Sequence, residues 1–248
     1  MARLGFIGLG NMGCSMAANL ARAQAPKTFT VFDISPANID SLKSKLSDTN
    51  IEVIVANDPA MVAKNSSAVV TMLPSSPHVK SVFTDANGLL STASKNSLFL
   101  DSSTIDPLVA KEVAKITSDA GSIYMDAPVS GGVTAAAAGT LTFMVGSESN
   151  ELFADANELL KHMGANIFQL TGVGSGQVAK ICNNMMLGVQ MVSTGEAYNL
   201  AEKLGMNAAE FAQIVNVSSG RCWSSDTYTG FFDSTILSRS VNGSKFMK

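Results

Sequence analysis

The stretch RLGFIGLGNMGCSMAANLARAQ, residues 3–24, decides the fold of this chain. It opens with an apolar run that suits a buried parallel strand, and apolar residues then recur every four positions, as on one face of a helix. The pattern G-x-G-x-x-G, formed by Gly8, Gly10 and Gly13, joins the two. A strand that passes through this pattern into a helix is typical of dinucleotide-binding domains.

Each glycine of this turn has its own predicted role. Gly8 allows a tight turn, Gly10 lets the backbone approach a pyrophosphate, and Gly13 lets the helix pack closely against the strand. The helix N-terminus directs free N–H groups and the positive end of its dipole at the anion. We therefore expect this turn, with Asn11 and Met12 inside it, to bind the phosphates of a dinucleotide.

An acidic residue follows at the spacing that the fingerprint requires. Residues 28–32, TFTVF, predict a second strand that ends at Asp33, twenty positions after Gly13. A carboxylate at that place can accept both hydroxyls of an adenosine ribose and repels a 2′-phosphate, which favours NAD over NADP. The alternative is that Asp33 only caps the next helix, near whose start Pro36 lies.

The composition excludes several classes of protein. A hydrophobic content of 46% with 15% charged residues is typical of a well-packed globular protein. The net charge of −3, without Lys and Arg clusters, argues against nucleic acid or an anionic membrane as a partner. The three scattered Cys residues and two His residues lack metal-ligand spacing, so we expect reduced thiols and no metal site.

Targeting signals are also absent from the sequence pattern. No apolar run reaches transmembrane length. The first strand begins at Arg3 and leaves no room for a targeting peptide. This predicts a cytosolic protein, or an organellar protein whose transit segment is absent from this chain.

Alternating strands and helices predict an α/β fold with a doubly wound, mostly parallel sheet. Ligands bind beyond the carboxyl ends of the strands in such sheets, so we expect the loops at residues 73–78, 101–104 and 126–132 to line one cleft. Further strands are expected at residues 51–55, 68–73, 98–100, 123–125, 141–145 and 167–170, and helices at 36–46, 59–64, from 107, and 148–163.

A glycine-rich hinge at residues 171–176 marks the predicted end of the Rossmann domain, which we place at residues 1–173. Residues 174–228 are predicted to be a partial all-α domain, with one long helix at 177–204 and a second at 208–215. The apolar stripe of the long helix consists of Val178, Ile181, Met185, Val189 and Val192.

Lys180 and Asn184 stand four positions apart near the start of the long helix, so both project from one face. Most lysines near a helix start are solvated surface residues, and the helix dipole there disfavours their charge. A lysine partly desolvated beside an oxidised nicotinamide would instead have a lowered pKa and could act as a base. The spacing alone leaves both interpretations open.

Several motifs resemble the β-hydroxyacid dehydrogenase family, and within it the 3-hydroxyisobutyrate dehydrogenases of valine breakdown. The motifs are GFIGLGNMG at residues 5–13, DSSTIDP at 101–107, DAPVSGG at 126–132, GQVAKICNN at 176–184 and SSGRCWSSDTY at 218–228. The resemblance implies an NAD-dependent oxidoreductase that converts a small 3-hydroxy acid to its semialdehyde, namely 3-hydroxyisobutyrate to methylmalonate semialdehyde. In eukaryotes it implies the mitochondrial matrix as the compartment.

The resemblance also implies roles for the matching residues. Lys180 would take the substrate hydroxyl proton, and Asn184 would hold the substrate and the lysine in place. The substrate carboxylate would be bound by Ser130, Gly131 and Gly132. The far half of the cofactor site would be lined by Leu73, Pro74, His78 and Thr104.

Residues 229–248 depart from the family pattern, which predicts a divergent tail after Tyr228. The family's complete all-α domain closes the cleft and usually builds the homo-oligomer, so turnover by this chain is expected to be weak and NAD binding to persist. Two alternatives remain open at this point. One is an NADPH-linked reductase of glyoxylate or succinic semialdehyde, and the other is a non-catalytic NAD-binding relative.

Overall fold

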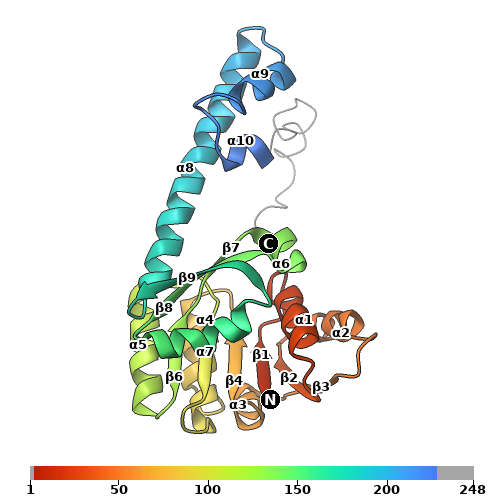
Figure 1. Cartoon of the computed structure of the whole chain (residues 1–248), viewed down its shortest axis with the longest axis vertical. Coiled ribbons are helices and arrows are strands. Elements are labelled where there is room, and N and C mark those ends of the chain that lie inside the picture. Colours follow the sequence, from red (N-terminus) through yellow and green to blue (C-terminus); the bar gives the residue numbers. More distant parts are fainter. Residues whose placement is uncertain (1–2, 228–248) are drawn as a thin grey trace. The chain divides into compact units, whose positions relative to one another are not determined.

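The computed structural model describes residues 3–227 and contains a six-stranded parallel sheet. The strands are β1 (Leu4–Ile7), β2 (Thr28–Phe32), β3 (Glu52–Val55), β4 (Ala68–Thr71), β5 (Leu98–Asp101) and β6 (Ile123–Asp126). They lie in the order β3-β2-β1-β4-β5-β6, and every neighbouring pair is parallel (Figure 1). The order reverses beside β1, which is where doubly wound sheets bind their ligands. The predicted fold class is confirmed.

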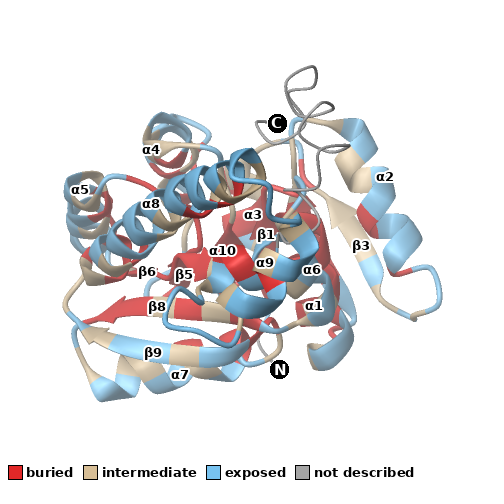
Figure 2. Cartoon of the chain, turned by 90° about the horizontal axis from the view of Figure 1, so that it is seen from above, coloured by how far each residue is buried: buried red, intermediate tan, exposed pale blue. Residues whose placement is uncertain are grey.

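Helices cover both faces of this sheet. They are α1 (Gly13–Gln24), α2 (Pro36–Lys45), α3 (Pro59–Asn65), α4 (Ser76–Thr84) and α5 (Pro107–Asp119), with a short 3₁₀ helix η1 (Leu89–Ser91) after α4. Successive side chains of a strand point to opposite faces, so each buried strand feeds two cores. On β5, Leu98 and Leu100 belong to the core that contains the buried residues of α1 and α2, whereas Phe99 belongs to the core that contains those of α3, α4 and α5. Figure 2 shows β5 and β8 largely in red, as buried strands, whereas the edge strands β3 and β9 are mostly tan and pale blue.

A second, three-stranded sheet extends the first core. It consists of β7 (Val129–Ser130), β8 (Leu141–Ser147) and β9 (Gly164–Thr171), accompanied by α6 (Gly132–Ala138) and α7 (Asn150–Leu160). The β7–β8 pair is antiparallel and the β8–β9 pair is parallel. On β8, Leu141, Phe143 and Val145 alternate inward and join the core that contains α1. The two late strands predicted from the sequence are therefore present, and each is longer than predicted.

Three expected segments differ from the structure. The loop predicted at residues 74–78 is mostly helix, because α4 begins at Ser76 with Ser75 as its N-cap and Pro77 in its first turn, where proline is tolerated. The strand predicted at residues 68–73 ends at Thr71. The exit loop predicted at residues 126–132 contains the short strand β7 and the start of α6. Polar residues and glycines are common both in loops and at helix N-termini, so the sequence predicted loops where the structure has the first turns of helices.

The chain divides into two units, Met1–Ile181 and Cys182–Lys248, and the long helix α8 (Ser175–Lys203) belongs to both. The domain boundary predicted at residue 173 stays a prediction. The second unit contains the rest of α8 with α9 (Ala208–Val215) and α10 (Trp223–Thr227). Asn207 caps α9 by accepting the Ala209 N–H at 2.8 Å. The predicted tail at residues 229–248 lies outside the described residues.

The apolar stripe predicted for α8 is exposed along its whole length: Val178, Ile181, Met185, Val189 and Val192 are all between 43% and 68% exposed. The Tyr198 ring, in contrast, is buried and meets the Phe211 ring edge to face at 4.9 Å. Among the described residues, no helix combines the length and the apolar character needed to cross a membrane.

Candidate active site

The glycine-rich turn between β1 and α1 has the geometry that its pattern predicts. Gly8 has a φ of +91°, and a Cβ there would overlap the Met72 carbonyl. A Cβ on Gly13 would overlap the Gly8 carbonyl, so the helix can pack this closely only with glycine. Gly10 faces open space, with nothing within 4 Å of where a Cβ would stand. Helix α1 has no side-chain cap, and its N-terminal N–H groups suit an anion above Gly10.

Asp33 lies just after β2 and holds the glycine-rich turn. One carboxylate oxygen accepts the Leu9 N–H at 2.6 Å. The other accepts the Ser35 N–H at 2.7 Å and the Asn38 side-chain amide at 3.0 Å. The residue at the N-cap position of α2 is Ser35, so Asp33 is more than a cap for that helix. A carboxylate offers about four acceptor positions, so one is still available for a ribose hydroxyl.

A cleft of about 540 Å³ opens between the glycine-rich turn and the loop after β4, and we call it the β1–β4 cleft. Its volume is in the range of small-molecule sites. Six of the predicted cofactor residues line it, namely Gly8, Gly10, Asp33, Leu73, Pro74 and His78. The residues present therefore fit the adenosine side of a dinucleotide. The loops at residues 101–104 and 126–132 do not contribute to this lining.

The remaining predicted cofactor residues lie outside that lining. Asn11 and Met12 are in the turn itself, and Gly13 is buried beneath it. Thr104 is exposed and follows β5, in the loop that continues from Ser103. Ser103 accepts the Leu73 N–H through its hydroxyl at 2.8 Å, so the loop after β5 supports the wall of the β1–β4 cleft.

The predicted carboxylate-binding residues stand at the junction of β7 and α6. Ser130 ends β7, and Gly131 is at the N-cap of α6 without a side-chain cap. Gly131 and Gly132 both have positive φ angles, +134° and +70°. Successive backbone N–H groups in such conformations form concave anion sites. The sequence prediction of a carboxylate-binding loop is compatible with this geometry.

Lys180 is the buried cation of the candidate site. It lies in the first turns of α8 and is only 8% exposed. Burial lowers the pKa of its amine from the ordinary value of 10.5. Within residues 3–227, no hydrogen bond or ion pair to another residue holds this amine. Asn184, one helical turn further along α8, is exposed and belongs to the second unit.

Two buried aspartates were not assigned a role from the sequence. Asp101 accepts hydrogen bonds from the Thr71 hydroxyl at 2.8 Å and the Tyr124 hydroxyl at 3.0 Å. Asp126 accepts the Gly174 N–H at 2.7 Å, near the start of α8. Burial raises the pKa of both carboxyl groups. A carboxylate directly after an apolar strand was the available signal, since the two residues directly follow the strands predicted at residues 98–100 and 123–125.

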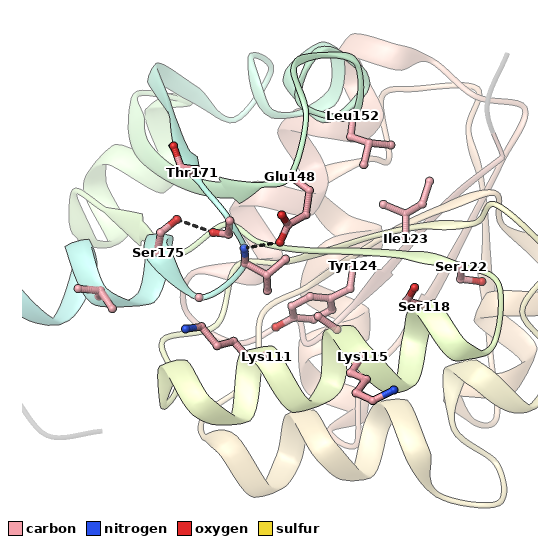
Figure 3. Close-up of a pocket in the computed structure, with 15 residues that line it drawn as sticks. Lys111, Lys115, Ser118, Ser122, Ile123, Tyr124, Glu148, Leu152, Thr171 and Ser175 are labelled. Atoms are coloured by element: carbon pink, nitrogen blue, oxygen red, sulfur yellow. Dashed lines mark hydrogen bonds between the residues drawn. The ribbon is translucent and has the colours of Figure 1, made fainter.

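A second hollow of about 770 Å³ lies between α5, β6 and the segment before α8 (Figure 3). None of the predicted site residues lines it. Figure 3 shows Glu148 directed at the glycine-rich segment, where its carboxylate accepts the Val173 N–H at 3.2 Å. The Ser175 hydroxyl donates to the Gly172 carbonyl at 2.6 Å beside it. These bonds brace the chain just ahead of α8.

Known families match both parts of the chain. Residues 3–172 match the NAD binding domain of 6-phosphogluconate dehydrogenase, and residues 174–245 match the NAD-binding domain of NADP-dependent 3-hydroxyisobutyrate dehydrogenase. The mitochondrial 3-hydroxyisobutyrate dehydrogenase of Rattus norvegicus is 48% identical over 97% of this chain and 70% of its own length. This chain belongs to the 3-hydroxyisobutyrate dehydrogenase family. The family resemblance and the NAD-binding domain inferred from the sequence are confirmed.

Further relatives agree with this assignment. The human mitochondrial enzyme of the same name is 49% identical over 91% of this chain and 64% of its own length. A solved structure of the Mycobacterium tuberculosis 3-hydroxyisobutyrate dehydrogenase with L-serine superimposes with a TM-score of 0.81 at 37% identity, covering 92% of this chain and 74% of that one. This chain spans 64% to 73% of the length of the mammalian and Dictyostelium relatives that it matches.

Proposed function

We propose that this chain catalyses the NAD-dependent oxidation of 3-hydroxyisobutyrate to methylmalonate semialdehyde. The observation that carries the proposal is Lys180, a buried amine without a described partner, whose pKa is lowered by burial. An amine of this kind can be neutral nearer physiological pH and so accept a proton. The relatives named as 3-hydroxyisobutyrate dehydrogenases support the choice of substrate.

Each residue of the site has a proposed task. NAD, when bound, supplies the hydride acceptor. Lys180 takes the hydroxyl proton of the substrate while the carbinol C–H bond gives up its hydride and the C=O bond forms. Asn184 holds the substrate hydroxyl and the lysine. The substrate carboxylate is bound by the loop of Ser130, Gly131 and Gly132, whose two glycines are exposed and have positive φ angles that suit an anion site.

Asp33 supports NAD as the preferred cofactor. Its carboxylate lines the β1–β4 cleft, where an adenosine 2′-phosphate would meet a negative charge already fixed by three hydrogen bonds. Relatives named as mitochondrial support the mitochondrial matrix as the compartment. The exposed apolar stripe of α8 supports a homo-oligomer.

The test is NADH formation by the purified chain with 3-hydroxyisobutyrate. We expect Lys180→Ala to lower kcat by about 10²–10⁴-fold, the range typical for loss of a general base, without weakening NAD binding. Lys203→Ala is the matched control, because Lys203 lies exposed at the other end of α8. Full activity of Lys180→Ala would refute the proposed base.

Two further outcomes identify the competing functions. Faster turnover of glyoxylate or succinic semialdehyde with NADPH would replace the proposed substrate and cofactor. NADH binding without turnover of any of these compounds would leave a non-catalytic NAD-binding protein.

A further inference from the structure

Asp126 is a buried carboxylate that connects the sheet to the start of α8. It ends β6 and is fully buried. Its two oxygens accept separate N–H groups, that of Gly174 at 2.7 Å and that of Gln177 at 2.9 Å. Gly174 directly precedes α8 and Gln177 lies in its first turn, where backbone N–H groups lack partners within the helix. Asp126 therefore caps α8 from a strand that lies about fifty residues earlier in the chain.

Two glycines make room for this carboxylate. A Cβ on Gly176 would stand 2.8 Å from one Asp126 oxygen and would overlap the Met144 carbonyl. A Cβ on Gly146 would overlap the other Asp126 oxygen. The strand β8, the turn before α8 and the end of β6 thus meet around one side chain. If the α8 N-terminus shifted, the Asp126 carboxylate would stay buried but lose its hydrogen-bond donors, which costs folding free energy.

Gln177 makes the second connection. Its side chain is fully buried. Both the nitrogen and the oxygen of its side-chain amide form hydrogen bonds with the loop after β5. The amide nitrogen donates to the Ser103 carbonyl at 2.8 Å, and the amide oxygen accepts the Ile105 N–H at 3.0 Å. These two hydrogen bonds therefore fix the position of the first turn of α8 relative to the loop after β5.

The loop after β5 leads to the β1–β4 cleft. The Ser103 hydroxyl accepts the N–H of Leu73, a residue that lines the cleft. Lys180 lies three residues after Gln177 on α8 and has no described hydrogen bond of its own. The position of its amine therefore depends on the position of the α8 backbone, which Asp126 and Gln177 hold.

We propose that Gln177 and Asp126 are positioning residues: together they fix the first turn of α8, and with it the Lys180 amine, to the loop that follows β5. This inference rests on the proposed function, because it takes Lys180 as the base. Neither residue touches the reacting atoms in this scheme. Misplacement of a catalytic group by about 1 Å costs on the order of 10²-fold in rate, so the expected effect is on kcat.

The first test variant is Gln177→Met, which keeps the length of the side chain and removes both amide hydrogen bonds. Gln190→Met is the matched control, since Gln190 lies on the same helix and only its backbone carbonyl accepts a described side-chain bond. Asp126→Asn is the second variant, because it keeps the shape of the side chain but must turn an NH₂ group toward one of the two N–H donors. It keeps the test valid if Gln177→Met folds poorly.

Three measurements are made on each variant. These are kcat and KM for 3-hydroxyisobutyrate, the Kd of NADH, and the pH dependence of Lys180 acylation by acetic anhydride, followed by mass spectrometry. We expect Gln177→Met to lower kcat by about 10–100-fold with the Kd of NADH unchanged. We also expect Lys180 to titrate closer to its ordinary pKa of 10.5, because a displaced amine is less buried.

The outcomes separate this inference from the proposed function. The acylation profile needs no turnover, so a shift in Gln177→Met supports positioning even if the chain proves inactive on every substrate. An unchanged acylation profile, with kcat falling only as the folded fraction falls, would overturn it. Unchanged kcat and an unchanged profile in both variants would overturn it as well.

Discussion

Two glycine-containing turns frame the candidate site, and they differ in how far along the sequence the residues that support them lie. The turn between β1 and α1 is shaped by its own glycines, since Gly13 packs directly on the Gly8 carbonyl, and by Asp33, which accepts the Leu9 N–H from 24 positions further along the chain. The turn between β9 and α8 contains two glycines with positive φ, Gly172 at +80° and Gly174 at +89°. Its position depends on Asp126, whose oxygens bind it from a strand far away in sequence.

This contrast indicates which part of a site can be recognised in a sequence. A turn whose supports all lie within one strand–helix–strand unit, as Gly13 and Asp33 do, has a spacing that can be recognised. A turn stabilised by a distant carboxylate shows only small residues ahead of a helix. The two turns should therefore respond differently to substitution.

The largest effect is expected at the β1–α1 turn. Gly13→Ala places a methyl group against the Gly8 carbonyl, which must move, and overpacking of this kind costs about 1–3 kcal/mol. We expect a lower Tm and weak NADH binding. Gly10→Ala meets open space, so its Tm should stay unchanged while NADH affinity falls at least about tenfold, a loss of about 1.4 kcal/mol.

Thermal melting without cofactor and NADH titration by fluorescence measure the two effects separately. Gly188→Ala serves as the control, because Gly188 lies within α8 and a Cβ there meets nothing within 4 Å. It should melt slightly higher, since alanine favours helix over glycine. Normal NADH affinity in Gly10→Ala would contradict the placement of the pyrophosphate above this residue.

The same contrast explains how much was predictable from the sequence. The strand–turn–helix of residues 3–24 and the acid at Asp33 follow from local spacing, and the structure places them as expected. Helix α4 was missed because Ser75 and Pro77, which start it, are also common in loops. The short strand β7 was missed because its two residues form a strand only by pairing with β8. The roles of Asp126 and Gln177 require contacts between residues about fifty to seventy positions apart.

A smaller effect is expected at Asp33, and it tests how local the first turn is. Asp33→Ser removes the negative charge, so NADPH affinity should rise by roughly tenfold, in line with the discrimination of one charged contact. It also removes the acceptor of the Leu9 N–H, so NADH affinity should fall. Asp33→Asn is the matched variant, because an amide oxygen can still accept that N–H. Titration with both cofactors measures the change.

Comparison of the two Asp33 variants separates two contributions of this side chain to cofactor binding, its hydrogen bond to the Leu9 N–H and its negative charge. If Asp33→Asn binds NADH as tightly as the unaltered chain, the hydrogen bond to Leu9 matters more than the charge. If Asp33→Ser and Asp33→Asn discriminate between the cofactors as the unaltered chain does, Asp33 does not meet the ribose.

The smallest effect is expected in stability at Lys180, on the helix α8 whose start is held by Asp126. Burial lowers the pKa of this amine in the folded chain, whereas the unfolded chain keeps the ordinary value of 10.5. Below the lowered pKa both states carry the charge, and the folded state bears the full cost of burying it. As pH rises from the lowered pKa toward 10.5, only the unfolded state stays charged, so this cost disappears.

Lys180→Met should therefore melt a few degrees higher than the unaltered chain near neutral pH, although it lacks turnover. The gap should narrow as pH rises toward 10.5. The same protonation predicts that oxidation of 3-hydroxyisobutyrate rises with pH up to the lowered pKa and then levels off, because only the neutral amine accepts a proton. A Tm gap that is independent of pH would mean that packing, and not the buried charge, separates the two chains. In that case the turn before α8 would position Lys180 without lowering the pKa of its amine. The two turns would then differ only in how their backbones are held.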